Sequence, residues 1–136
     1  MYERDYIMRM IEAFAKMIAA IVGLREKGEL DKARSLVEEA YDTVLKVNSE
    51  EIKEYDQDQW NQFCSKRSPE ELEMLADLLK VEGEIMLDSG KPEGVGKILF
   101  KAFQLLKLVE VQSGAFSLTR FDKITELEQK LSGFDY

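Results

Sequence analysis

The chain has 136 residues, of which 45% are hydrophobic and 34% are charged, and its formal net charge is −8. This composition suits one domain with a hydrophobic core, and it is neither that of a disordered chain nor that of a membrane protein. Because an acidic surface repels phosphate backbones, we expect no nucleic acid among the partners.

Two residue counts limit the chemistry that this protein can perform. Histidine is absent, which removes the commonest general base and every zinc site built on histidine. Cys64 is the one cysteine, so the chain has no internal disulfide, as is typical of a reducing cytoplasm. The acidic pairs along the chain are typical of helix first turns and solvated faces. We therefore predict a protein that is not an enzyme and that carries no metal or other cofactor.

The most apolar run of the sequence covers residues 8–22. It contains three charged residues and is too short to span a membrane. A secretory signal is also disfavoured, because Glu3 and Asp5 stand where a basic start belongs. We therefore expect a soluble, cytoplasmic protein that does not bind a membrane.

Apolar residues recur at intervals of three and four, which predicts helices throughout. The first helix is expected over residues 3–27, with Gly28 as its C-terminal turn, and the second over residues 30–47. An acidic segment over residues 48–67 follows, in which we expect one or two short helices. The side chains expected to face inward in that segment are Ile52, Tyr55, Trp60 and Phe63.

A further helix begins at Ser68-Pro69, because serine caps helix N-termini and proline suits the first helical position. Another is expected over residues 93–112, and a last one begins near Thr119. The expected organisation is one all-helical domain of about six helices over residues 1–136: a first hairpin (1–47), an irregular acidic linker (48–67), a second hairpin (68–113) and a terminal capping helix (117–133).

Residues 88–97, DSGKPEGVGK, are rich in glycine and lysine and invite comparison with a phosphate-binding loop. The motif fails, because its first glycine is a lysine here and neither serine nor threonine follows the Gly-Lys pair. A corner between helices fits better. Gly90 suits the left-handed end of a helix, and Pro92 suits the first turn of the next. Gly94 and Gly96 each lower helix stability by about 1 kcal/mol, which close packing against a neighbouring backbone would explain.

The first helix is apolar over an unusually wide arc. One seam consists of Ile7, Met10, Phe14, Met17, Ile21 and Leu24. The second seam consists of Ile11, Ala15, Ile18 and Val22. Together they span about 180°, whereas a surface helix needs about 100°. The helix over residues 93–112 is similarly broad. Either both are central helices of a bundle, or the second seam is a subunit interface.

Two segments resemble the tetratricopeptide repeat (TPR): LREKGELDKARSLVEEA (24–40) and LKVEGEIMLDSGKPEGVGKILFKA (79–102). Gly28 and Gly90 match the turn glycine of the repeat. The small residues of the repeat are matched by Ala33, Ala40, Gly83 and Ala102. Because the copies are further apart than one repeat length, they do not form a regular array. The resemblance implies TPR-like helical hairpins in a single right-handed stack or bundle.

The opening YERDYIMRMIE, the hairpin, the acidic linker and LADLLKVEGEIMLDSG are together similar to an uncharacterised bacterial family of short TPR-like proteins. That resemblance implies no activity. A TPR binds partners on its concave face, which would here include Ala15, Ile18 and Val22 of the second seam. In the second hairpin that face would hold Asp77, Lys80 and Glu84, which we interpret as solvated charges.

We therefore predict a non-enzymatic protein-interaction scaffold, self-associating as a homodimer. The expected interface is the second seam, Ile11, Ala15, Ile18 and Val22. The alternative is a small-molecule sensor or enzyme with a pocket between the helix pairs, which the broad apolar helices favour.

Overall fold

The computed structural model describes residues 2–136, and all regular elements in that range are helices, as the sequence predicted. They are α1 (Tyr2–Glu26), α2 (Leu30–Glu39), the π-helix η1 (Ala40–Leu45), α3 (Ser49–Glu54), α4 (Gln57–Ser65), α5 (Pro69–Asp88), α6 (Val95–Ser113) and α7 (Leu118–Leu131). The acidic linker thus contains two short helices. In it Ile52 and Trp60 are buried, and Tyr55 and Phe63 are half-buried.

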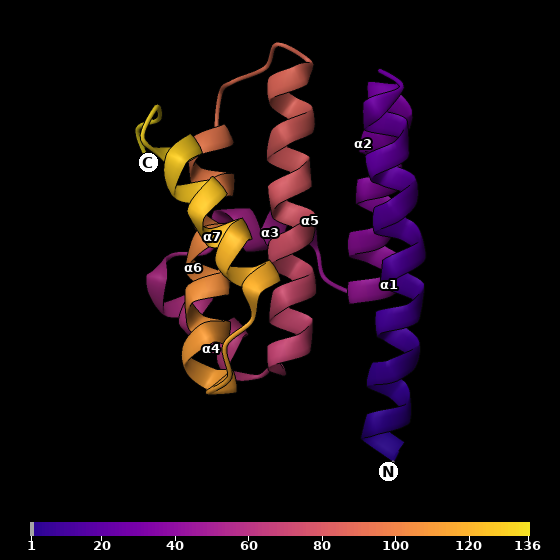
Figure 1. Cartoon of the computed structure of the whole chain (residues 1–136), viewed down its shortest axis with the longest axis vertical. Coiled ribbons are helices and arrows are strands. Elements are labelled where there is room, and N and C mark those ends of the chain that lie inside the picture. The colour runs from indigo at the N-terminus through magenta and orange to yellow at the C-terminus, as the bar shows by residue number, and fades with distance from the viewer. Residues whose placement is uncertain (1) are drawn as a thin grey trace.

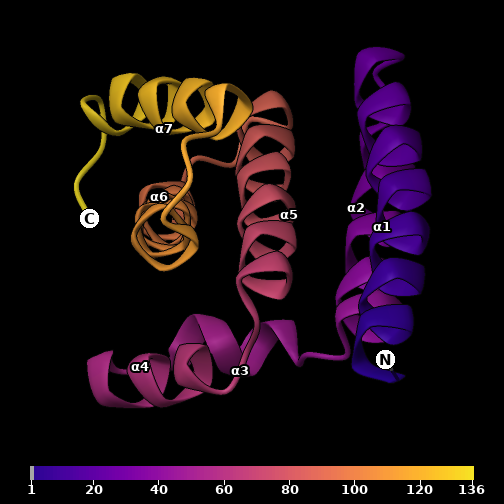
Figure 2. The same ribbon diagram turned by 60° about the horizontal axis from the view of Figure 1, so that its bottom comes forward.

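Helix α5 is the centre of the fold (Figure 1). The α1–α2 hairpin lies along one side of α5 and α6 lies along the other (Figure 2). Helix α7 and the α3–α4 segment flank α6 on opposite sides (Figure 2). The large apolar side chains that α5 buries are Leu72, Met74, Leu75, Leu78, Leu79, Val81 and Ile85. These side chains join the α1–α2 hairpin and α6 into one hydrophobic core.

The two helices with wide apolar arcs, for which a central position was one of two interpretations, behave differently. Helix α6 is covered on two sides, because α5 packs against it and Lys101 lies 4.8 Å from the ring centroid of Trp60 on α4. Helix α1 is peripheral, so its interpretation as a central helix is wrong. Of the α1 side chains that the structure describes, three are buried: Met10, Phe14 and Ile21.

The helix boundaries follow local chemistry at several points. Ser68 Oγ accepts a hydrogen bond from the backbone N–H of Glu71 at 3.2 Å, at the expected start of α5. Gly28 and Gly90 end α1 and α5 with φ of 77° and 72°, a conformation that costs glycine little.

The corner before α6 differs from the expectation. Helix α6 begins at Val95, so Pro92 lies in the turn before the helix instead of in its first turn. Gly94 is the residue before α6 and has φ 79°, so it costs the helix nothing. A Cβ on Gly96 would lie 2.8 Å from the backbone oxygen of Asp135, so this glycine admits the C-terminal segment against α6.

The second helix also differs from the expectation, because residues 40–45 form a π-helix and Lys46 is left-handed with φ 54°. The wider turn buries Ala40, Tyr41 and Leu45. The Tyr41 hydroxyl donates to Glu82 Oε1 on α5 at 2.6 Å, and the backbone N–H of Val47 closes the turn on the Tyr41 carbonyl at 2.9 Å. The change of helix type thus accompanies the attachment of this segment to α5.

Candidate functional site

A groove of about 430 Å³ lies between α1 and α5 and reaches the start of α7. Three of the predicted interface residues, Ile11, Ala15 and Ile18, line one wall. Phe14 also lies in this wall. The other wall is α5, which contributes Pro69, Met74 and the acidic Glu70, Glu73 and Asp77. Val109, Ser113 and Arg120 complete the lining. The groove is therefore mostly apolar with an acidic wall.

The two seams of α1 have different surroundings. The first seam faces α2, η1 and α5, where Phe14 is 4% exposed and Ile21 is fully buried. In the second seam Ile11 and Ile18 are half-buried, whereas Ala15 is exposed and Val22 is 40% exposed. Val22 lies outside the groove lining, nearer the C-terminal end of α1. The structure thus leaves an apolar strip of α1 open to solvent.

Arg120 closes the groove at the α7 end, and sequence reasoning missed it. Its guanidinium donates to Glu110 Oε2 at 3.1 Å, Glu73 Oε1 at 3.0 Å, Ser113 Oγ at 3.2 Å and the Ala115 carbonyl at 2.8 Å. The hydrogen bonds that the guanidinium donates to Glu110 and then to Glu73 raise the Arg120 pKa. The residue is 6% exposed, so it ties α7 to α5 and α6 from inside the fold. Its carboxylate partners are distant in sequence, and no local pattern indicates them.

The charges assigned to the concave face of the second hairpin are paired, so their interpretation as solvated charges is wrong. Glu84 is 6% exposed and forms ion pairs with Lys80 at 3.1 Å, with Arg25 of α1 at 3.5 Å, and with Lys130 of α7. Arg25 also reaches Asp88 at 2.6 Å. These pairs connect α1, α5 and α7, because cations from two other helices approach the acidic face of α5.

Asp77 lies in the groove wall. Burial raises its pKa, and the Lys123 ammonium at 2.8 Å offsets part of that shift. A carboxyl whose pKa is higher in the folded state than in the unfolded state binds more protons in the folded state. The free energy of unfolding therefore falls as pH rises from the unfolded-state pKa through the folded-state pKa.

We therefore expect Asp77→Asn to gain stability relative to the natural protein as pH rises from 3 to 6, because asparagine does not titrate. Urea denaturation across this range measures the difference. If the stability of Asp77→Asn relative to the natural protein instead fell as pH rises, the pairing with Lys123 would outweigh the effect of burial on the Asp77 pKa. Glu12→Gln at an exposed position of α1 is the matched control for exchanging a carboxylate for an amide.

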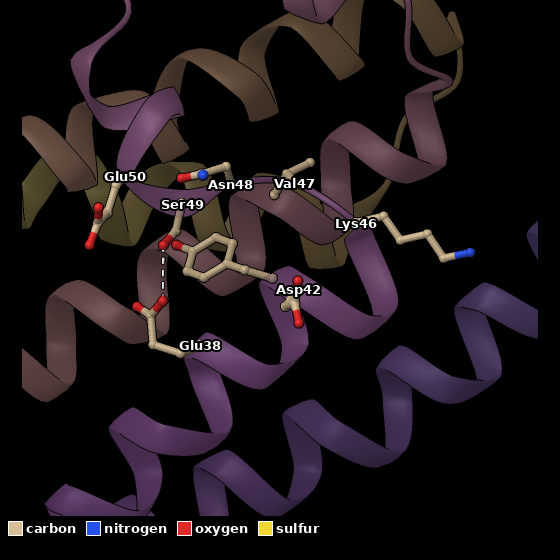
Figure 3. A pocket seen from close by; sticks show the side chains of 8 residues that line it. Glu38, Asp42, Lys46, Val47, Asn48, Ser49 and Glu50 are labelled. Carbon is tan, nitrogen blue, oxygen red and sulfur yellow. Dashed lines mark hydrogen bonds between the residues drawn. The ribbon is translucent and has the colours of Figure 1, made fainter.

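A second pocket of about 460 Å³ lies beside η1 and is lined largely by polar residues (Figure 3). The Glu38 carboxylate accepts a hydrogen bond from Ser49 Oγ at 2.9 Å, while Lys46 points away from this pair. Tyr41 and Lys53 both donate to Glu82, each at 2.6 Å. Burial and the Glu82 charge raise the Tyr41 pKa well above its usual value. These groups fasten η1 and α3 to α5 and leave the Tyr41 phenol un-ionised at neutral pH.

The remaining candidate groups are accounted for within the fold. Cys64 is 4% exposed, and burial raises the pKa of its thiol to about 11, so it is a poor nucleophile at neutral pH. Across residues 2–136 no three side chains of the histidine, cysteine and acidic types are grouped to hold a metal ion. In that same part of the chain, no helix has the length and apolar character to cross a membrane.

The chain matches the model of one protein family over residues 1–116, and that family is described as a family of unknown function (DUF6483). The matched region contains both hairpins and the acidic linker and ends before α7. No curated protein and no solved structure matches the chain.

Proposed function

The chain belongs to the DUF6483 family, whose function is unknown, and we propose that it is a non-enzymatic protein-interaction scaffold that associates with itself through α1. The observation that carries this proposal is the second seam of α1, which keeps Ala15 and Val22 exposed beside the half-buried Ile11 and Ile18. Contiguous apolar strips of this kind are costly in water and mark interaction surfaces.

The finer architecture belongs to the same proposal. We infer that α1–α2 and α5–α6 act as two TPR-like pairs of a single right-handed stack in a bacterial cytoplasmic protein. In support, each pair is joined by a turn with a left-handed glycine, Gly28 in the first and Gly90 in the second. The long α1 would then present the second seam at the open edge of the first pair.

The groove suits a helix better than a small molecule. A sensor or enzyme needs polar groups in its pocket that are available to a ligand. The Arg120 guanidinium donates hydrogen bonds to Glu73, Glu110, Ser113 and the Ala115 carbonyl. The Asp77 carboxylate is paired with the Lys123 ammonium. The apolar wall formed by α1 is thus the part of the groove that is open for binding.

Light scattering from micromolar to millimolar concentration tests self-association directly. We expect the mass to approach twice the 15.7 kDa of one chain. A constant monomer mass over the whole range would contradict self-association. A thermal-shift screen with metabolites then tests the alternative, because a bound small molecule raises the melting temperature.

A further inference from the structure

We infer that a second copy of this chain docks antiparallel on α1, so that the two α1 helices cross near Ala15 and Arg4 of each lies beside Glu26 of the partner subunit. This inference rests on the proposed self-association. It adds the relative orientation of the two α1 helices and the charged residues that select that orientation. It follows from the order of residues along the exposed strip of α1, taken in three steps.

The first step is the spacing of the strip. Met8 is 48% exposed and extends the second seam by about one turn, giving a line in which Met8, Ala15 and Val22 are exposed and Ile11 and Ile18 are half-buried. The intervals alternate between three and four residues, which keeps such a line on one face when two helices pack at about 20°. The strip therefore has the pattern that one long helix uses to pack along another.

The second step is the position of the smallest residue. Ala15 lies at the middle of the strip, with two larger apolar residues on each side. A small residue at a crossing point lets two helices approach closely, while the larger side chains fill the space on either side. In an antiparallel pair crossing at Ala15, Met8 faces Val22 of the partner subunit to within about one helical turn. The strip is thus complementary to itself.

The third step is the charge at the two ends. At about 100° per residue, Arg4 and Glu26 fall on the same face of α1 as the strip, one at each end, and both are exposed. Antiparallel packing brings Arg4 beside Glu26 of the partner subunit at both ends. Parallel packing would bring like charges together instead, and such contacts select against an orientation.

The surroundings of α1 leave room for this partner. The N-terminal end of α1 projects beyond the other helices (Figure 1). Helix α1 has 25 residues and is therefore about 37 Å long. Along it, the open strip borders the groove whose far wall is α5. A second helix can thus follow the strip without displacing an element of the fold.

Cysteine cross-linking of the full chain tests the orientation. In a Cys64→Ala background, Met8→Cys and Val22→Cys chains are mixed in equal amounts and treated with a short bismaleimide. We expect a mixed dimer that joins one chain of each kind, identified by its mass. In a parallel pair these two positions would be about 21 Å apart, and Met8→Cys would link to itself.

Charge reversal provides an independent readout. Arg4→Glu and Glu26→Arg are each expected to weaken self-association about tenfold, because two symmetry-related ion pairs become repulsive. The double variant, Arg4→Glu with Glu26→Arg, should restore the affinity of the natural protein. This rescue distinguishes a specific pairing from a general loss of stability.

The outcomes distinguish the antiparallel arrangement from self-association itself. A self-linked Met8→Cys dimer, or a double variant that stays weak, overturns the antiparallel arrangement while self-association stands. A dimer mass with no α1 cross-link overturns the strip as the interface. A monomer mass with no cross-link overturns the proposed function as well.

Discussion

Ile18→Glu is expected to raise the dissociation constant of the self-associated protein at least about 100-fold, because it places a carboxylate in the middle of an apolar interface. Both copies carry the change, so the free-energy cost of burying the carboxylate applies twice in the twofold dimer. Ile18 is half-buried in the groove wall, so a carboxylate there remains partly solvated in the monomer. Light scattering measures the association, and circular dichroism measures helicity, which should change little.

Two further variants separate the interface from the fold. Ala15→Glu alters an exposed position in the same strip and should weaken association similarly with less effect on the monomer. Ala20→Glu places the same charge on the opposite, exposed face of α1 and should leave association unchanged. Unchanged association in Ala15→Glu would argue against the second seam, and global unfolding of Ile18→Glu would assign that residue to the core.

Arg120→Ala is expected to lower the free energy of unfolding by about 2 kcal/mol, the largest single loss among the polar contacts considered. The change leaves the carboxylates of Glu73 and Glu110 without their buried cation. Both carboxylate side chains are 32% exposed, so water compensates in part and the loss stays below that of a fully buried pair. For a chain of this size the melting temperature should fall by roughly 6–8 °C.

Urea or thermal denaturation of Arg120→Ala measures this loss. Arg120→Lys is the graded control, because lysine keeps the charge and cannot hold two carboxylates in a fixed fork. Lys107→Ala on the exposed face of α6 is the neutral control and should change stability by less than about 0.5 kcal/mol. If Arg120→Ala is equally mild, then the apolar contacts of α7 hold it in place without the arginine.

The acidic residues of α5 show why its central position was not predicted from the sequence. Helix α5 carries acidic residues along its whole length, including Glu73, Glu82 and Glu84, and such a helix is ordinarily partly solvated. In the structure these charges face Arg120 and Lys130 of α7 and Lys53 of α3. The sequence indicates how much charge a helix carries, but distant cations decide whether that charge is buried.

The π-helix is a second feature that local pattern could not indicate. The helical spacing continues through residue 47, so a single helix over residues 30–47 was the natural prediction. The helix changes from α to π at Ala40, and the hydroxyl of the next residue, Tyr41, donates a hydrogen bond to Glu82 of α5. Gly96 is similar, because the backbone that requires a glycine there belongs to Asp135, which lies at the far end of the chain.

The sequence by itself determined the all-helical class, the two glycine-ended hairpins and the start of α5 at Ser68-Pro69, because helical periodicity, left-handed glycines and N-caps act within a few residues. It also determined that α1 is apolar over about 180°, since that follows from residue order alone. The tertiary structure decided which half of that surface is covered. The first seam meets α2, η1 and α5, whereas Ala15 and Val22 remain exposed, because burial depends on the neighbours that long-range folding supplies.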